Sequence, residues 1–253
     1  MSFVQFCQFI VLFLLSVLLA VPGCVIGGPS WFWNNYISYS TDPITTHQKS
    51  DDNSVVVFVH GRNGHDSSFY DTIKGLKKLG VNKTLITVYL GPTGKTSVVE
   101  DTNTLYNLIK QIGAKKVILV GLSKGGLTVS NYVATYGTAN VSAVITISSP
   151  LGGTLTASYL MKPIEWICGQ HIARTELGYQ SDFTIDLEER LPADIPFFHV
   201  VPTWDHLVIP VSSASIKGPN HISRVFDEKY YSHLNIQSSP RVLKWIAELI
   251  NTY

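Results

Sequence analysis

The sequence predicts an α/β fold, a doubly wound and mostly parallel sheet of about six strands with helices on both faces. Two observations lead to this prediction. The chain has 253 residues, which is enough for one domain with a sizeable core. Short apolar, β-branched runs alternate along it with longer segments whose apolar residues recur at helical spacing. Strands that alternate with helices form βαβ units, in which the strands are parallel and the helices cover both faces.

Five continuous apolar runs are the predicted strands. The first, VVVFVH, shows no polar alternation and is therefore typical of a strand buried on both faces. The aromatic- and turn-rich segment before it, residues 27–53, is expected to add one edge strand. The five runs cover residues 55–60, 84–90, 117–121, 141–147 and 197–202.

Four segments between and after these runs are predicted helices, and a fifth segment breaks the alternation. Phe69, Ile73 and Leu76 recur at helical spacing, and the last helix, RVLKWIAELI, is amphipathic. Residues 155–190 combine an apolar, Trp-containing stretch with an acidic one. Because insertions at the carboxyl ends of parallel strands lie over the active site, we expect a short lid there. The predicted helices cover residues 67–79, 97–112, 125–136 and 241–250.

Composition and charge exclude several classes of protein. The chain is 45% hydrophobic and 15% charged, which argues against disorder. Its net charge of +1 is spread without the basic cluster that a nucleic-acid-binding surface needs. Cys7, Cys24 and Cys168 lack the spacing of a zinc site, and we expect unpaired thiols rather than a Cys24–Cys168 disulfide. We therefore expect a monomer without a metal or cofactor.

The first 26 residues are expected to take the protein out of the cytosol. No side chain is charged before Asp42, and residues 9–20 form an apolar run that ends at a Pro-Gly turn. A short apolar core followed by small residues is typical of a secretory signal peptide. An uncleaved membrane anchor, a buried helix and lipidation at Cys24 are the alternatives. Residues 27–253 would then be the folded domain.

The segment GLSKGG, residues 121–126, carries the main chemical signal. It follows an apolar strand and opens a helix, which is the setting of the G-x-S-x-G nucleophile elbow of α/β-hydrolases. The glycines let strand and helix approach closely while Ser123 adopts a strained backbone conformation. The Ser123 hydroxyl then lies at a helix N-terminus, where N–H groups favour a developing anion. Ser123 is the predicted nucleophile.

A nucleophilic serine needs a base that is oriented by an acid, and in this fold both follow the serine, acid first. Asp205 lies three residues beyond the last predicted strand and is the predicted acid. Asp182 and Asp186 are competitors, but they belong to an acidic helical stretch that is expected to face solvent.

Three histidines follow Asp205. His233 lies just before the final helix and is the predicted base. The side chain of His206 would diverge from the adjacent acid. His221 lies in a polar, turn-rich stretch typical of a surface histidine, and it is the main alternative to His233.

Two backbone N–H groups, those of Lys124 and Arg62, are the predicted oxyanion hole, each worth roughly 3 kcal/mol in the transition state. Arg62 belongs to HGRNGH, which directly follows the first long strand. His60 is expected to be a buried, hydrogen-bonded support of this loop. The basic side chains of Lys124 and Arg62 are expected to be solvated charges near the mouth of the site, with binding of an acidic head group as the alternative.

Taken together, these motifs resemble lipase-like α/β-hydrolases, most of all secreted bacterial triacylglycerol lipases and GPI inositol-deacylase-like hydrolases. VVVFVHGRNGH, VILVGLSKGG, ITISSPLGGT, WDHLVIP and SHLNIQSSP occur in the order and at the approximate spacing of that group. The resemblance implies the same assignments for Ser123, Asp205, His233, Arg62 and Lys124. Lys at position 124, Arg at position 62 and the short lid depart from the pattern, and they put long-chain triglyceride specificity in doubt more than the reaction class.

The predicted function is hydrolysis of carboxylic esters, in particular lipid esters, through an acyl-enzyme. The partners expected are a small-molecule or lipid ester and a membrane or lipid interface, without nucleic acid. Acyl transfer by the same three residues and a non-catalytic binding role on the hydrolase scaffold are the alternatives, and a peptidase is a weaker one.

Overall fold

The computed structural model describes residues 41–51, 54–91, 96–160 and 172–253. The predicted signal or anchor segment and the middle of the predicted lid therefore lie outside the described residues. Among the described helices, none has the length and apolar character needed to cross a membrane.

The described residues form one seven-stranded sheet in the order β1-β3-β2-β4-β5-β6-β7. β1 pairs antiparallel with β3, and every other neighbouring pair in this sheet is parallel. The mostly parallel sheet that was predicted is thus confirmed. Its strands are β1 (Ile44–Gln48), β2 (Ser54–Val59), β3 (Thr84–Val88), β4 (Lys116–Leu122), β5 (Val141–Ile147), β6 (Phe197–Pro202) and β7 (His221–Phe226).

The five predicted inner strands and the expected edge strand are present, and the sheet has one strand more than the six named from the sequence. The additional strand is β7, whose sequence is HISRVF. Its four central residues are exposed because β7 is the last strand at its edge of the sheet. An exposed edge strand lacks the continuous apolar run by which the inner strands were found.

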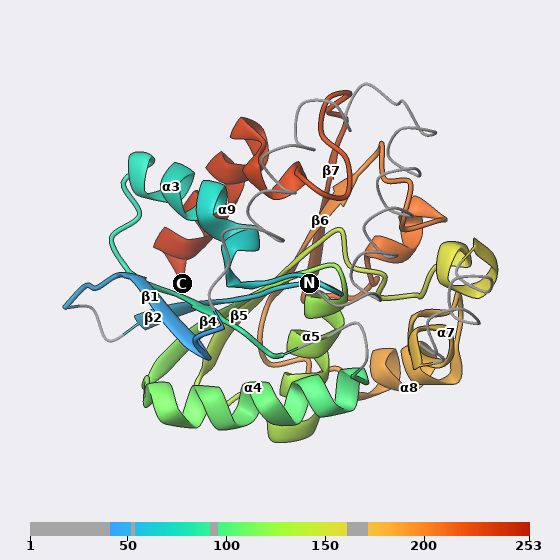
Figure 1. Cartoon of the computed structure of the whole chain (residues 1–253), viewed down its shortest axis with the longest axis horizontal. Helices are drawn as coiled ribbons and strands as arrows, with labels where there is room; N and C mark the ends of the chain where they lie inside the picture. Colours follow the sequence, from blue (N-terminus) through green and yellow to red (C-terminus); the bar gives the residue numbers. More distant parts are fainter. Residues whose placement is uncertain (1–40, 52–53, 92–95, 161–171) are drawn as a thin grey trace.

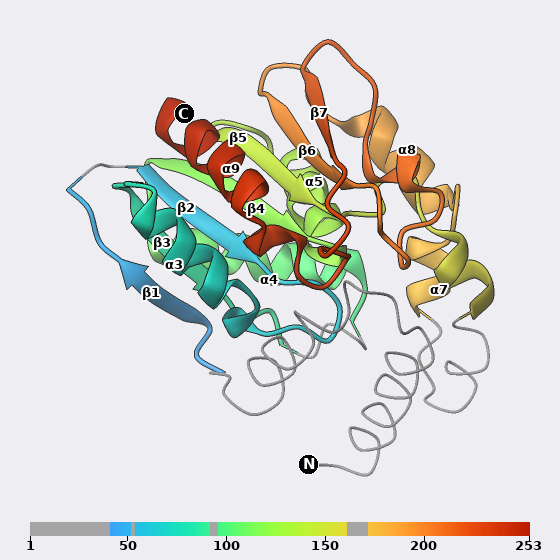
Figure 2. The same ribbon diagram turned by 90° about the horizontal axis from the view of Figure 1, so that it is seen from above.

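Helices cover both faces of the sheet, as Figures 1 and 2 show. One face carries α3 (Tyr70–Lys78) and α9 (Pro240–Thr252), and the opposite face carries α4 (Val98–Ile112) and α5 (Lys124–Tyr136). Two shorter helices lie in the region of the predicted lid: α8 (Asp182–Arg190) contacts α5, and α7 (Ile172–Leu177) contacts α8. The sheet is therefore doubly wound, as the alternation of strands and helices predicts.

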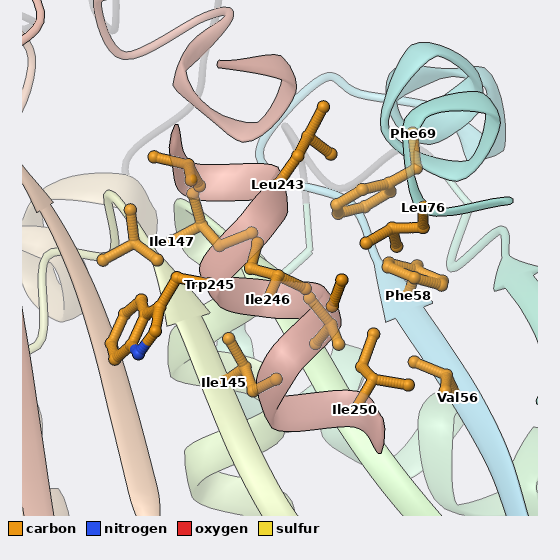
Figure 3. Packing of buried hydrophobic residues seen from close by; sticks show 14 of the residues in the cluster. Val56, Phe58, Phe69, Leu76, Ile145, Ile147, Leu243, Trp245, Ile246 and Ile250 are labelled. Atoms are coloured by element: carbon orange, nitrogen blue, oxygen red, sulfur yellow. The ribbon is translucent and has the colours of Figure 1, made fainter. Parts of the chain in front are cut away.

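Alternate residues of β2 enter two separate hydrophobic layers. Val56 and Phe58 pack with α3 and α9, whereas Val57 and Val59 pack with α4 and α5. Figure 3 shows the first layer, in which Ile246 and other apolar side chains of α9 lie over the strands. Each buried side chain of this size contributes about 1.5–3 kcal/mol relative to an exposed one. A strand that faces two such layers has no polar position, which explains the run VVVFV.

The helix α4 begins and ends where its sequence indicates. The Ser97 hydroxyl accepts a hydrogen bond from the Glu100 amide at 3.0 Å, and the Glu100 carboxylate accepts one from the Ser97 amide at 2.7 Å. Gly113 ends the helix in a left-handed conformation, with φ of 68°. The first turn of α4 contacts the start of α5, because Asp101 Oδ2 lies 2.8 Å from Lys124 Nζ.

Candidate active site

Ser123 occupies a sharp turn between β4 and α5. Its backbone has φ of 55° and ψ of −123°, a combination that is strained for a residue with a side chain. The turn is held because the Ser123 amide donates to the Ile147 carbonyl at 2.9 Å and the Gly126 amide donates to the Ser123 carbonyl at 2.9 Å. The hydroxyl of Ser123 therefore lies at the carboxyl edge of the sheet and at the start of a helix.

Two glycines make this turn sterically possible. A Cβ at position 121 would lie 2.4 Å from the Gly125 carbonyl oxygen, and a Cβ at position 125 would lie 2.2 Å from the Val59 carbonyl oxygen. Both obstacles are backbone atoms, which cannot rotate away as a flexible side chain can. The close approach predicted from GLSKGG is therefore present.

The structure brings the three predicted side chains together. His233 Nε2 lies 2.8 Å from Ser123 Oγ, and His233 Nδ1 lies 2.8 Å from Asp205 Oδ2. His233 and Asp205 are both buried. A carboxylate only accepts hydrogen bonds, so Nδ1–H donates to Asp205 and Nε2 is free to accept from the Ser123 hydroxyl. The arrangement can thus remove a proton from Ser123.

Backbone groups hold the acid and the base in place. Asp205 Oδ1 accepts from the amides of Leu207 and Val208, at 2.8 Å and 2.9 Å. His233 lies in a tight loop in which Asn235 Oδ1 accepts from the Ser232 amide at 2.7 Å. The Asp205 carboxylate is therefore fixed by three groups, which are these two amides and His233. The side chain of Asn235 fixes the loop that carries the imidazole.

The competing acids and bases lie elsewhere. Asp182 and Asp186 are exposed on α8, as expected. His221, expected at the surface, is instead the first residue of β7, at the amino edge of the parallel sheet. It is half-buried, its ring stacks on Phe197, and its Nδ1 lies 3.0 Å from Nε2 of His199. The sequence did not predict this burial of His221, because it did not predict strand β7.

The loop after β2 lies against the elbow. A Cβ on Gly61 would lie 3.0 Å from the Ser123 Cβ, so a side chain at position 61 would crowd Ser123 and the backbone just before Arg62 lies close to it. The loop turns at Asn63, with φ of 54°, and the Gly64 amide donates to the Gly61 carbonyl at 3.1 Å. The amides of Arg62 and Lys124, the two predicted donors, thus belong to segments that meet at Ser123.

His60 supports this loop from below, as predicted. It is buried, its Nε2 accepts from the Leu90 amide at 3.1 Å, and its Nδ1 lies 2.9 Å from the Gly61 carbonyl oxygen. Burial lowers the pKa of His60 to about 4, so its ring is neutral at pH 7. The rings of His60 and His65 both stack on Tyr89, with centroids 5.6 Å and 5.4 Å away.

The prediction of a solvated Lys124 side chain is wrong. Lys124 is only 3% exposed, and its Nζ lies 2.8 Å from Asp101 Oδ2 on α4 and donates to the Thr96 carbonyl at 2.6 Å. Burial lowers the pKa of Lys124, and Asp101 opposes this shift. Burial raises the pKa of Asp101, and Lys124 opposes that shift in turn. Arg62 is half-buried rather than fully solvated.

Two acidic residues near the elbow were not singled out from the sequence. Asp101 lies on the same helix face as Val98, Leu105 and other buried residues, and a charged residue at such a position was the available signal. Glu176 of α7 accepts from the Val98 amide at 2.7 Å, which joins the predicted lid region to the start of α4. Nothing in the spacing of the sequence indicates this long-range contact.

Among the residues that the structure describes, no group of three or more His, Cys, Asp or Glu side chains is arranged to hold a metal ion.

Several lipases and esterases are among the solved structures that are similar to this chain. The mature lipase BlEst2 of Bacillus licheniformis has a TM-score of 0.63 at 18% identity, covering 82% of this chain and 97% of the lipase. The monoacylglycerol lipase of Paleococcus ferrophilus has a TM-score of 0.62 at 19% identity, covering 83% of this chain and 98% of that one. Naproxen esterase from Bacillus subtilis has a TM-score of 0.58 at 14% identity, covering 82% and 86%. These likenesses establish the α/β-hydrolase fold.

The sequence profile of one family, palmitoyl protein thioesterase, matches residues 55–185, slightly more than half of the chain. The matched part includes the loop after β2, the turn at Ser123 and most of the predicted lid region, residues 155–190. A comparison with curated protein sequences found no match. The resemblance to lipase-like α/β-hydrolases is confirmed, and the chain belongs to the palmitoyl protein thioesterase family, as a carboxylic ester hydrolase of the α/β-hydrolase fold.

Proposed function

We propose that the protein hydrolyses acyl esters or thioesters with Ser123 as nucleophile, His233 as general base and Asp205 as the group that orients His233. One observation carries this proposal: the unbroken row of hydrogen bonds from Asp205 through His233 to Ser123, with 2.8 Å at each step. A hydroxyl, an imidazole and a carboxylate in this order are the minimum for nucleophilic acyl transfer by serine.

The reaction proceeds in two halves. Ser123 Oγ attacks the acyl carbonyl carbon while His233 Nε2 takes the hydroxyl proton, and Asp205 stabilises the imidazolium. The tetrahedral intermediate collapses, the bond to the leaving oxygen or sulfur breaks, and His233 returns the proton to that atom. Water then attacks the acyl-enzyme with His233 again as base, which releases the free acid and restores Ser123.

The amides of Lys124 and Arg62 are proposed to bind the oxyanion of each tetrahedral intermediate. The Lys124 amide belongs to the first residue of α5, at the positive end of the helix dipole, which favours a developing negative charge. The Arg62 amide follows Gly61, where an added Cβ would lie 3.6 Å from Ser123 Oγ. Two such donors in a water-poor site act on the charge that develops only in the transition state.

Apolar side chains around Asp205 support an acyl group with a hydrocarbon chain. Trp204 and Leu207 are both 40% exposed, and Ile209 is 39% exposed. Leu155 at the start of the predicted lid is also exposed, and its backbone lies beside this segment because its amide donates to the Ile209 carbonyl at 2.8 Å. Exposed apolar side chains that gather beside a reactive group mark a surface for an apolar ligand. The family name, palmitoyl protein thioesterase, points to the same class of acyl group.

A substrate series with a serine variant tests this proposal. The wild-type protein should hydrolyse p-nitrophenyl esters and acyl-thioesters, and long acyl chains should be preferred to acetyl. Ser123→Ala should lose about four to six orders of magnitude in kcat.

A labelling experiment identifies the nucleophile directly. A fluorophosphonate probe should label the wild type and a Ser212→Ala control, since Ser212 is an exposed serine that is not hydrogen-bonded to His233. Equal labelling of Ser123→Ala would refute the assignment. Measuring free acid against transacylated product separates hydrolysis from acyl transfer.

For the region before the described residues, we propose a cleaved secretory signal over residues 1–26 and a secreted, monomeric product that works at a lipid interface. The apolar run of residues 9–20 supports this proposal. N-terminal sequencing of the protein from culture medium should give a chain that begins near residue 27. A full-length chain that stays in the membrane fraction would favour the uncleaved anchor instead.

A further inference from the structure

A buried cation directly follows the nucleophile. Lys124 is the first residue of α5, yet its side chain does not face the substrate side of the elbow as a free charge. It extends to the N-terminal end of α4, where its Nζ meets the Asp101 carboxylate at 2.8 Å and the Thr96 carbonyl at 2.6 Å. The Lys124 and Asp101 side chains are only 4% and 1% exposed.

Fold stability alone does not account for this pair. Removing two charges from water carries a large desolvation penalty, and apolar residues of similar volume often give equal or greater stability. Buried charge pairs are useful where they hold a particular geometry.

The pair connects the first turns of two helices. Asp101 is itself held, because its Oδ1 accepts from the Thr96 hydroxyl at 2.5 Å. The same end of α4 is bonded by Glu176, which accepts from the Val98 amide at 2.7 Å. Lys124 is thus fixed at one end by the elbow backbone and at the other by α4. The amide between Ser123 and Lys124 lies at the first of these ends.

We propose that Asp101 is a positioning residue that holds the oxyanion-binding amide of Lys124 through the Lys124 side chain, an inference that rests on the proposed function. Asp101 does not touch the substrate. Its carboxylate fixes the ammonium, the ammonium fixes the first turn of α5, and that turn carries the amide.

Replacing Asp101 with Asn should therefore lower kcat more than it changes KM. An amide that is displaced from the oxyanion loses transition-state binding, whereas substrate binding is unaffected. We expect kcat of Asp101→Asn to fall about 10- to 100-fold and KM to stay within about twofold. The inhibition constant of a boronic acid, which forms a tetrahedral adduct with the serine, should rise by the factor by which kcat falls.

A double-mutant cycle tests whether the effect passes through Lys124. In a Lys124→Met background the tether is already absent, so adding Asp101→Asn should change kcat by less than about twofold. A purely structural role of Asp101 would lower the melting temperature but leave kcat per active site unchanged, with sites counted by complete fluorophosphonate labelling. Asp186→Asn is the matched control, since it makes the same chemical change at an exposed pair with Arg190.

The outcomes separate the two proposals. Wild-type kcat in Asp101→Asn, or an equal loss in both backgrounds, overturns the positioning role. If Asp101→Asn does not fold, Thr96→Val decides: it removes one hydrogen bond to Asp101 and should lower kcat about threefold at constant KM, and no change in kcat overturns the role. Activity that survives Ser123→Ala would instead overturn the proposed function, whatever Asp101→Asn does.

Discussion

Ser123 lies between two buried acid–base pairs of the same length. On one side His233 Nδ1 is 2.8 Å from Asp205 Oδ2, and on the other Lys124 Nζ is 2.8 Å from Asp101 Oδ2. The first pair is carried by two loops at the carboxyl edge of the sheet, and the second by the first turns of α4 and α5. Both carboxylates are buried and accept further hydrogen bonds.

The two pairs differ in what their bases do next. The imidazole of His233 has a second nitrogen, which faces Ser123 Oγ at 2.8 Å and can take up a proton. The ammonium of Lys124 has only donors, and these bond Asp101 and the Thr96 carbonyl. Pair length and burial therefore do not decide a role in catalysis. The role of each pair in catalysis depends on the remaining contacts of its base. Each pair can be broken separately by substitution.

The largest effect is expected from Asp205→Asn. The substituted amide can donate to His233 Nδ1, which favours the tautomer that carries its proton on Nε2 and cannot accept from Ser123. We expect kcat to fall about 10⁴-fold, as such a change does in other serine enzymes. The melting temperature should change little, because Asn can still accept from the amides of Leu207 and Val208. Steady-state kinetics with a thermal melt checks this, and activity within about tenfold of wild type would contradict it.

The backbone between the two pairs should tolerate little change. A Cβ at Gly125 would lie 2.2 Å from the Val59 carbonyl oxygen and 2.6 Å from that of His60. We expect Gly125→Ala to lower the free energy of unfolding by about 3 kcal/mol or more, because backbone must move. At Gly80, where φ is 80° and nothing lies within 4 Å, an alanine should cost only about 1–2 kcal/mol. Urea unfolding of both variants measures the difference, and equal losses would argue against steric closure of the elbow.

A third buried base allows a pH test away from both pairs. Burial lowers the pKa of His199 to about 3, and Nδ1 of the ring lies 2.8 Å from the Thr146 hydroxyl. Unfolded histidine takes up its proton near pH 6.5, so between about pH 6.5 and pH 3 the unfolded chain binds more protons than the native one. Stability therefore falls as the pH is lowered through this window.

The expected contribution of His199 is a slope of about 1.4 kcal/mol per pH unit in that window. Replacing His199 with Asn should remove this contribution and flatten the dependence of unfolding free energy on pH between about 6.5 and 5. Urea unfolding at a series of pH values measures it. His60, whose pKa burial lowers to about 4, should leave a residual slope of the same sign. An unchanged slope in His199→Asn would mean that native His199 binds its proton in the same range as the unfolded chain.

The two pairs also differ in how far the sequence predicts them. Ser123, Asp205 and His233 were found because each follows or precedes an apolar run that locates a strand or helix, and the chain order of the fold restricts the choice. The structure brings these three side chains together. The fold class and inner strands follow from the same apolar runs, since residues buried on two faces leave no polar position.

Features that depend on long-range contacts were not predictable from spacing. β7 has four exposed central residues because it lies at the sheet edge, so no apolar run marks it. His221 was consequently expected at the surface. Lys124 was expected to be solvated, because nothing in GLSKGG indicates that Asp101, on another helix, would receive its ammonium. Burial of a charge is decided by its partner, which single-sequence patterns do not identify.

The smallest effect is expected at an exposed pair of a basic side chain and an aspartate. Arg190 Nε lies 2.7 Å from Asp186 Oδ2, which is shorter than the Lys124–Asp101 distance, but the Asp186 side chain is 60% exposed. Water and salt screen such a pair, so Asp186→Asn should change the free energy of unfolding by less than about 0.5 kcal/mol and leave kcat unchanged. Breaking the buried pair by Asp101→Asn should cost about 3–5 kcal/mol, because it leaves a buried ammonium without its counterion. Urea unfolding of both variants at low and high salt measures the contrast. Equal losses would mean that the Lys124 ammonium reaches water in the folded protein, and the difference between the two pairs would then lie in their hydrogen bonds rather than in their burial.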